Sequence, residues 1–221
     1  GTKPQVTDLE GKTVLPGFID SHLHLLSFGL GLRYVSLVDV DSIDELKSRI
    51  RARAVESQKD GWIIGRGWDQ DQFRDKRYPT RKDLDDASDG RPVYIVRACG
   101  HIAVASSKAL EIAGVSRATQ DPPGGSIDRD AYGDPTGVLR EAAQGLVQPY
   151  IPEAGQDIME DALKKAIEYV LSKGITSVHT NDGHLGFPGT MDLYKKVQQQ
   201  GFPLRVYWDL PGELLADLIE T

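Results

Sequence analysis

The alternation of apolar and polar positions is most regular in the last third of the chain. Apolar residues between positions 157 and 170 recur at helical spacing, and the period ends at Gly174. A short apolar strand, Ile175 to His179, follows directly, and a second helical period spans Met191 to Gly201. Leu204 to Trp208 again has the character of a strand. Strands that alternate with helices in this way predict βαβ units around a parallel sheet.

The stretch from Thr13 to Leu26 is largely apolar and gains polar groups mainly toward its end. These polar residues are Asp20, Ser21, His22 and His24. A buried parallel strand that opens into a site has this pattern, because its body is covered by helices while its carboxyl end is not. The sequence therefore predicts that a strand in this stretch ends at a functional site.

The middle of the chain alternates short elements with polar loops. The sequence predicts helices from Ser42 to about Gly61, from Lys82 to Ala87 and from Ser106 to Ala113, and strands at Trp62 to Ile64 and Pro92 to Ala98. The segment from Thr119 to Thr136 is rich in proline and glycine and has no helical period, so we expect a loop or a small excursion. Without a repeat or a convincing linker, this middle part is interpreted as an insertion into an α/β frame.

Composition and charge limit the classes of partner. The 221 residues carry 26 basic and 33 acidic side chains, a net charge of −7, which argues against nucleic acid and favours a small-molecule substrate. No apolar run approaches the roughly 20 residues that span a bilayer, and the first residues lack the apolar core of a signal peptide. We therefore expect no membrane partner and a cytoplasmic location. The single cysteine, Cys99, excludes an internal disulfide and is interpreted as a small core residue.

His22 and His24 are the strongest candidates for chemistry. Residues i and i+2 of a strand point to the same face, so both imidazoles can reach one metal ion, with Asp20 on that face too. Neutral imidazole suits zinc, iron, nickel or manganese. Taken alone, a His-x-His pattern is more often two partly buried histidines bonded to backbone carbonyls, and that alternative stays open. His184, in a glycine-rich loop, has little claim to a role.

The eleven residues from Val14 to His24, VLPGFIDSHLH, closely resemble the first barrel strand of the amidohydrolase superfamily. The resemblance implies a metal-dependent hydrolase with a (β/α)8 TIM barrel, in which His22 and His24 bind the more buried metal. It implies one or two divalent ions, with zinc the expected metal, that activate water for attack on an amide, an ester or a carbon–nitrogen bond. These expectations come from the resemblance and not from the spacing of the histidines.

Further segments are similar to the YtcJ-like (amidohydrolase 3) branch of the superfamily. They are residues 61–70, 91–94, 100–101 with 107–110, and 133–142. This resemblance implies an α/β fold: part of a TIM barrel with an inserted α+β subdomain. Residues 1–31 would hold the first barrel strand with the metal motif, 32–150 the inserted subdomain over the barrel mouth, and 151–221 the next βα units. The strands at 18–24, 175–179 and 204–208 are then expected to be parallel.

Proteins of this branch are well over twice as long as the present chain. Their other ligands, a strand lysine, two histidines and an aspartate, come later, and the aspartate is the general base. The resemblance therefore implies an N-terminal fragment that is inactive alone, with its general base beyond Thr221. The expected function is hydrolysis of carbon–nitrogen bonds other than peptide bonds. The alternative is a catalytically silent fragment or a regulatory scaffold of the same fold.

Five more residues are candidate substrate-binding residues: Trp68, Asp69, His101, Glu141 and His179. Each has an ordinary structural alternative. Asp69 and His101 could be loop residues satisfied by solvent or by neighbouring groups, and Glu141 could be a favourable partner of a helix dipole. His179 could be a buried histidine without contact to substrate. Assembly into a homodimer is left open by the sequence.

Overall fold

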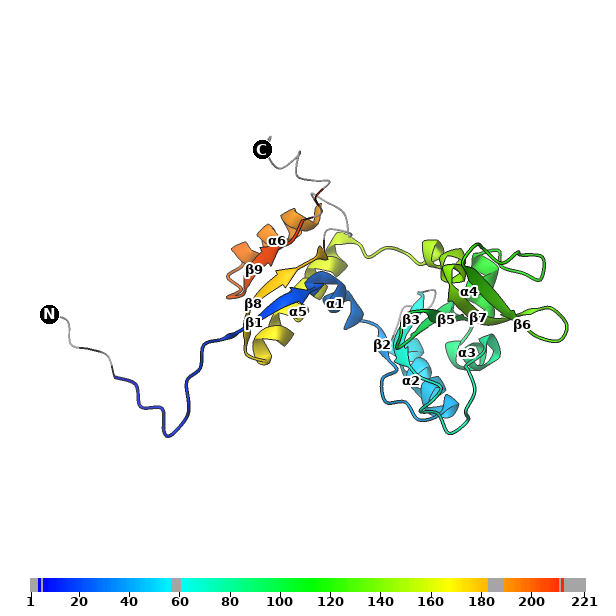
Figure 1. The fold of residues 1–221 in the computed structure, drawn as a ribbon, viewed down its shortest axis with the longest axis horizontal. Helices are drawn as coiled ribbons and strands as arrows, with labels where there is room; N and C mark the ends of the chain where they lie inside the picture. The colour runs from blue at the N-terminus through cyan, green and yellow to red at the C-terminus, as the bar shows by residue number, and fades with distance from the viewer. Residues whose placement is uncertain (1–3, 5, 57–60, 183–188, 211, 213–221) are drawn as a thin grey trace. The chain divides into compact units, whose positions relative to one another are not determined.

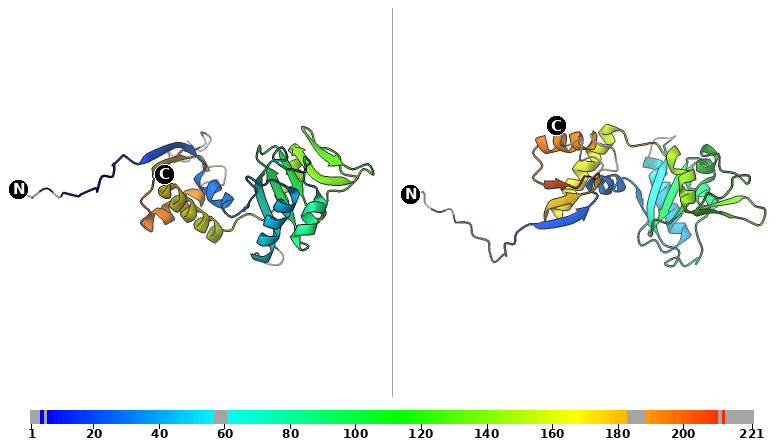
Figure 2. Two further views of the ribbon diagram at one scale, coloured as in Figure 1. Left: turned by 90° about the horizontal axis from the view of Figure 1, so that it is seen from below. Right: turned by 45° about the horizontal axis from the view of Figure 1, so that its top comes forward.

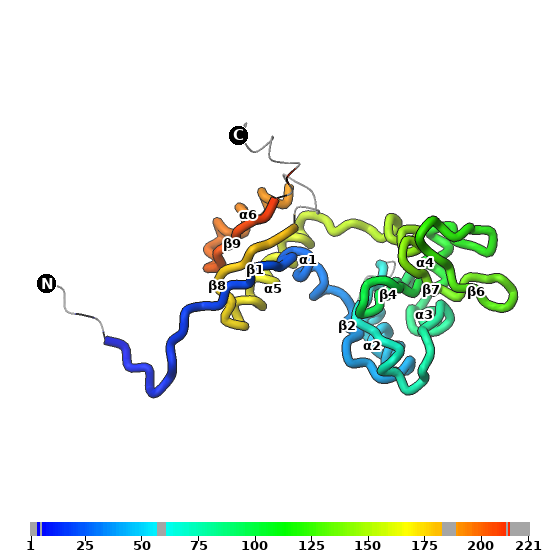
Figure 3. Tube along the Cα trace, in the orientation of Figure 1, coloured from blue at the N-terminus to red at the C-terminus, as the bar shows by residue number. Residues whose placement is uncertain are grey.

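The chain forms two compact units in the computed structural model (Figure 1). The structure describes residues 4, 6–56, 61–182, 189–210 and 212. The first unit joins residues 1–30 to 156–221, and the second comprises Gly31–Gly155. Figure 3 follows the chain as it leaves the first unit after its first helix and enters it again before the longest helix. In the described part of the chain, no helix has the length and apolar character needed to span a bilayer.

The first unit is built on a three-stranded parallel sheet in the order β1-β8-β9. Its elements are β1 (Phe18–Leu23), α1 (Leu25–Gly31), α5 (Gln156–Ser172), β8 (Ile175–Thr180), α6 (Gly189–Gln199) and β9 (Arg205–Trp208). The predicted parallel arrangement of these strands is confirmed. Their connections contain the helices that a parallel crossover needs. The three strands form an open sheet, so no barrel is closed within the described residues.

Helices α5 and α6 cover one face of this sheet (Figure 2). Val178 of β8 and Val206 of β9 pack there, in a core that includes Leu163 of α5. Because side chains alternate along a strand, His179 and Tyr207 lie on the opposite face. The unit thus separates an apolar face, which stabilises it, from a polar face beside the two candidate metal ligands.

Close packing of α1 on α5 requires a glycine. A Cβ atom at Gly29 would overlap the carbonyl oxygen of Ala162. Leu25 and Leu26, in the first turn of α1, are fully buried against the same helix cluster. The position of α1, and with it the turn that carries the histidines, is therefore fixed by backbone contact as well as by apolar burial.

The second unit is a mixed sheet in the order β2-β3-β4-β5-β7-β6. Its strands are β2 (Val35–Ser36), β3 (Ile63–Trp68), β4 (Val93–Arg97), β5 (Ile102–Ala105), β6 (Gly125–Arg129) and β7 (Pro135–Glu141). Its helices are α2 (Ile43–Glu56), α3 (Arg81–Ser88), α4 (Ser107–Ile112) and the 3₁₀ turns η1 (Ala142–Leu146) and η2 (Gln148–Tyr150). Strands β2 to β4 are parallel, and the remaining pairs are antiparallel.

Both faces of this sheet are buried. Val93 and Ile95 of β4 pack into the core that includes Leu46 of α2, whereas Tyr94 packs into a second core that includes Leu110 of α4. A strand covered on both faces is apolar throughout rather than alternating. The apolar run at 92–98 therefore predicted a strand, but it could not show which side chains belong to which face of the sheet.

Two predictions for the middle of the chain need correction. Residues 119–136 are not simply a loop, because β6 and the start of β7 lie there and pair in antiparallel fashion, with Ile127 opposite Leu139. Asp130 forms the connecting turn by accepting hydrogen bonds from the backbone of Tyr132 at 2.9 Å and Asp134 at 3.0 Å. Strand β5 was also missed. Hairpins of this length contain too few apolar positions to stand out among prolines and glycines.

Candidate metal centre

His22 and His24 stand where β1 passes into α1. His24 directly precedes the helix, and its carbonyl accepts the first helical hydrogen bond from the Phe28 N–H at 2.7 Å. Both residues are exposed. Their ring centroids lie 5.6 Å apart with the planes at 89°. The local sequence thus brings two imidazoles together at the carboxyl end of a parallel strand, the end at which barrel enzymes assemble their sites.

Simple alternation does not describe this strand. The register between β1 and β8 shifts between Asp20 and Leu23. Asp20 accepts a hydrogen bond from the His22 N–H at 3.1 Å, so its carboxylate is bonded to the backbone that leads into the site and not to an imidazole. The expectation that Asp20 shares the face of the two histidines through strict two-residue periodicity is therefore wrong. Irregular pairing of this kind is frequent beside functional sites, where it re-aims side chains.

Asn181, immediately after β8, contacts both histidine rings. Its main-chain carbonyl oxygen accepts from His24 Nδ1 at 2.9 Å. A carbonyl only accepts, so the proton lies on Nδ1 and the lone pair on Nε2. The side-chain amide nitrogen of Asn181 lies 3.2 Å from His22 Nδ1. For His24 this is the usual arrangement when Nε2 binds a metal, whereas Nδ1 of His22 faces an amide nitrogen, which can only donate.

The donor set fits part of a divalent metal site. Two neutral imidazoles are typical ligands of zinc, and the bond from His24 to the Asn181 carbonyl matches the second-layer bonding of metal-binding histidines. Zinc sites normally use three or four protein ligands. Among the described residues, no group of three or more histidine, cysteine, aspartate or glutamate side chains has the arrangement of a metal site. The described residues therefore offer two candidate ligands, fewer than such a site uses.

His179 lies on β8, the strand that pairs with β1. Its ring contact is with a residue of β9 and not with His22 or His24. Its ring stacks on Tyr207 of β9, with centroids 5.0 Å apart and planes at 30°. It is partly buried on the face opposite the helices. Its role in substrate binding stays a prediction. His184 lies outside the described residues.

Trp68 and Asp69 belong to the second unit. The Trp68 side chain is fully buried in the core, where its ring contacts those of Phe73 and Tyr78. The structure therefore gives Trp68 a packing role. Asp69 is partly exposed and accepts from the Arg97 guanidinium at 2.7 Å. Binding of substrate by either residue stays a prediction.

His101 and Glu141 form a pair in the second unit. His101 Nδ1 lies 2.9 Å from Glu141 Oε2, and the backbone of Glu141 donates to the His101 carbonyl at 2.8 Å. Glu141 adopts φ 50° and ψ −124°, a conformation that non-glycine residues rarely take. Glu141 directly precedes the 3₁₀ turn η1, but its side chain makes no capping hydrogen bond there. Its carboxylate is paired with His101 instead. Strained backbone of this kind is concentrated at functional sites.

Cys99 is exposed, which corrects its interpretation as a core residue. Strand β4 ends at Arg97, so Cys99 falls in the turn that follows. The hydrogen bond from the Arg97 guanidinium lowers the pKa of the Cys99 thiol. The apolar run before it gave no sign of where the strand would end.

The His101–Glu141 pair predicts a measurable pH dependence. The hydrogen bond to Glu141 raises the pKa of His101 above its ordinary value of 6.5. A raised pKa in the folded state means that the pair stabilises the fold below the unfolded value, and that this stabilisation is lost as pH rises through the folded value. NMR titration of the His101 ring should show a midpoint above 6.5 that falls in Glu141→Gln. An unchanged midpoint in that variant would show that the pair does not form.

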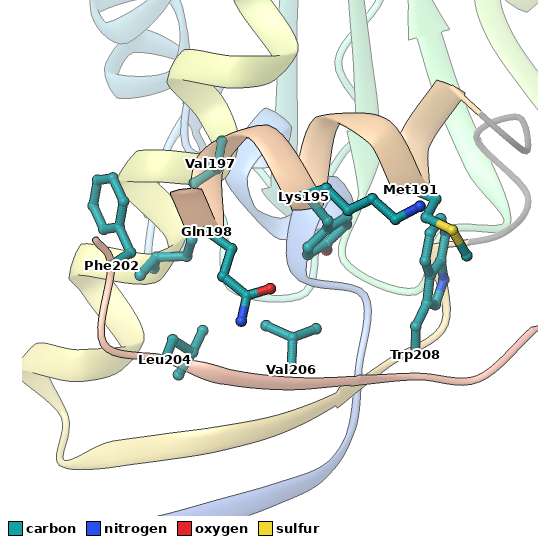
Figure 4. Close-up of a pocket in the computed structure, with 10 residues that line it drawn as sticks. Met191, Lys195, Val197, Gln198, Phe202, Leu204, Val206 and Trp208 are labelled. Atoms are coloured by element: carbon teal, nitrogen blue, oxygen red, sulfur yellow. The ribbon is translucent and has the colours of Figure 1, made fainter. Parts of the chain in front are cut away.

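A surface pocket lies elsewhere in the first unit. Side chains of β9 and of α6 face one another across it, among them Leu204, Val206, Trp208 and Gln198 (Figure 4). These strand residues point toward α6, away from the face that carries His179 and Tyr207. The pocket is thus on the helix side of the sheet and is separate from the candidate metal centre.

Sequence reasoning missed the residues that hold the centre in place. Thr180 ends β8, Asn181 and Asp182 follow it, and all three bond to the turn between β1 and α1. Their signal was available, because polar residues at the carboxyl end of a parallel strand are the same pattern that identified His22 and His24. The local sequence could not show that β1 pairs with β8, because this pairing joins segments more than 150 positions apart.

Comparison with known proteins yields a consistent set of relatives. The profile of the Amidohydrolase family matches residues 5–221. Protein LONG AFTER FAR-RED 3 of Arabidopsis thaliana is 44% identical over 186 residues, covering 84% of this chain and 31% of that protein. N-substituted formamide deformylase of Arthrobacter pascens is 34% identical over 171 residues, covering 76% of this chain and 31% of the enzyme.

Solved structures agree. The crystal structure of an uncharacterized metal-dependent hydrolase from Pyrococcus furiosus is 33% identical, with a TM-score of 0.64, and covers 93% of this chain and 40% of that chain. The chain thus spans less than half the length of the proteins it matches. The resemblance seen in the motifs from Val14 to Ala142 is confirmed.

Proposed function

We propose, starting from the fact that this chain belongs to the amidohydrolase family, that it carries the first metal-binding strand of a hydrolase acting on a carbon–nitrogen bond other than a peptide bond. One observation carries the proposal: the imidazoles of His22 and His24 meet at the carboxyl end of a parallel strand, each with Nδ1 engaged by Asn181. The name of one relative, N-substituted formamide deformylase, supports an amide-like substrate.

The residues of this chain have defined parts in that function. His22 and His24 would hold a divalent ion, zinc by preference, and Asn181 would orient both rings. The bound ion supplies polarisation of the scissile group and lowers the pKa of water toward neutrality. We propose that residues 32–150 form a cover that shapes the substrate pocket and that the exposed His101–Glu141 pair contacts the substrate there.

We propose that the functional protein is longer than this chain. The chain spans 31% of the length of two relatives, and two histidines are fewer ligands than a zinc site uses. We therefore expect the 221-residue chain alone to bind zinc weakly and to show no hydrolase activity, whereas the full-length gene product binds it firmly. Competition with a chromophoric chelator measures both affinities. The difference should exceed the roughly 10–100-fold that loss of a second-layer partner costs, because ligands themselves are missing.

Activity is tested on the full-length product loaded with zinc. N-formyl amines should be hydrolysed, with formate release as the readout, while a peptide should not. A protein that retains stoichiometric zinc but hydrolyses neither class contradicts the proposed reaction. A protein that retains no metal supports the alternative, a silent scaffold of the same fold.

A further inference from the structure

The segment that follows β8 is bonded to three consecutive residues of the β1–α1 turn. The Asn181 N–H donates to the carbonyl of Leu23 at 2.9 Å, its own carbonyl accepts from His24 Nδ1 at 2.9 Å, and its side-chain amide lies 3.2 Å from His22 Nδ1. One residue thus reaches both histidines and the strand between them. Contacts of this kind determine the direction of a ring and the nitrogen that carries its proton.

The peptide of Asn181 is itself fixed on both sides. Before it, the fully buried Thr180 accepts from the Leu25 N–H at 3.0 Å and, through its carbonyl, from the Asp209 N–H at 2.9 Å. After it, the fully buried Asp182 accepts from the Leu26 N–H at 2.8 Å. The carbonyl that bonds to His24 is therefore placed by the sheet and by the first turn of α1 together.

We propose that Asn181 is a positioning residue that fixes the proton of both imidazoles on Nδ1 and so presents Nε2 of each ring to the metal; this inference rests on the proposed function. For His24 the main-chain carbonyl of Asn181 fixes the proton on Nδ1 directly. At His22 the structure places Nδ2 of the amide, which can only donate, next to Nδ1. Metal binding through Nε2 of His22 therefore requires the amide to be rotated by 180°, so that Oδ1 accepts a hydrogen bond from the Nδ1–H group.

The side chain can be tested separately from the main chain. In the zinc-loaded full-length protein, Asn181→Ala removes the partner of His22 but keeps the carbonyl that serves His24. Zinc affinity should fall by about 10–100-fold, the usual effect of removing a second-layer partner. Asn181→Asp supplies a carboxylate oxygen at the same position, so its affinity should lie closer to that of the wild type than to that of the alanine variant.

Gln198→Ala is the matched control, because it removes an exposed amide side chain on α6, among the residues of the separate pocket. It should leave zinc affinity unchanged. Thermal unfolding of each variant separates loss of ligand orientation from loss of the fold. Wild-type protein that binds no zinc contradicts the proposed function. Wild-type and Asn181→Ala proteins that bind zinc equally well contradict the role of Asn181 alone.

A second measurement needs no metal. Asn181 is the only asparagine among these 221 residues, so selective ¹⁵N labelling of asparagine in the 221-residue chain gives one pair of side-chain amide signals. We expect this pair to shift in His22→Ala but not in Gln198→Ala. Long-range ¹H–¹⁵N spectra of the histidine rings should show His24 protonated on Nδ1. An amide pair that is identical in His22→Ala and wild type, or a His24 ring protonated on Nε2, would overturn the proposal.

Discussion

Replacement of His22 or His24 by alanine in the full-length protein is expected to remove the metal and to lower turnover by more than about 10³-fold. Loss of a single electrostatic donor already costs about 10²–10³-fold in related catalytic settings, and here the group that activates water would be lost with its ligand. Zinc content by mass spectrometry and formate release under identical conditions measure the two effects together.

The fold should survive these substitutions. Both histidines are exposed, and exposed side chains outside special features usually change stability by no more than about 0.5 kcal/mol. Circular dichroism and thermal unfolding of the metal-free proteins check this point. His184→Ala is the matched histidine control and should keep both metal and activity. Near-normal zinc content and turnover in both His22→Ala and His24→Ala would refute the assignment of the metal centre.

The sequence predicted the elements with a strong period and the parallel order of the first unit. Helix α5 and strands β1, β8 and β9 all follow from local apolar spacing, and α5 buries one continuous apolar face. Short antiparallel pairs were not found. Strand β6 has a single buried residue, Ile127, and its partners are set by tertiary pairing rather than by its own pattern.

The candidate site, like the fold, could be predicted only in part from the sequence. His22 and His24 could be proposed as ligands from a short motif, because the two histidines are only two positions apart. Their orientation could not, because it depends on Asn181, which is 157 positions from His24. The burial of Trp68 could not be predicted either, because it depends on tertiary contacts of its ring with Phe73 and Tyr78.

Asp182 connects this centre to the stability of the first unit. Its carboxylate is fully buried and accepts hydrogen bonds from the Leu26 N–H at 2.8 Å, from Thr180 Oγ1 at 2.7 Å and from the Tyr194 hydroxyl at 2.6 Å. Burial, followed by the charge of Asp182, raises the pKa of Tyr194, so the hydroxyl remains a donor. The carboxylate thus satisfies the start of α1, where helix N–H groups have no internal partner.

We expect Asp182→Ala to lower the free energy of unfolding of the first unit by about 3 kcal/mol or more, because each buried donor left without a partner costs about 1–3 kcal/mol. Tyr194→Phe removes one of these hydrogen bonds and should cost about 1.5–3 kcal/mol. Asp192→Ala, at an exposed position in the first turn of α6, should cost no more than about 1 kcal/mol. Urea unfolding gives the three values, and hydrogen exchange at the Leu26 amide should localise the loss to α1. If Asp182→Ala were no more destabilising than Asp192→Ala, the buried carboxylate would not be what holds the histidine-bearing turn against β8.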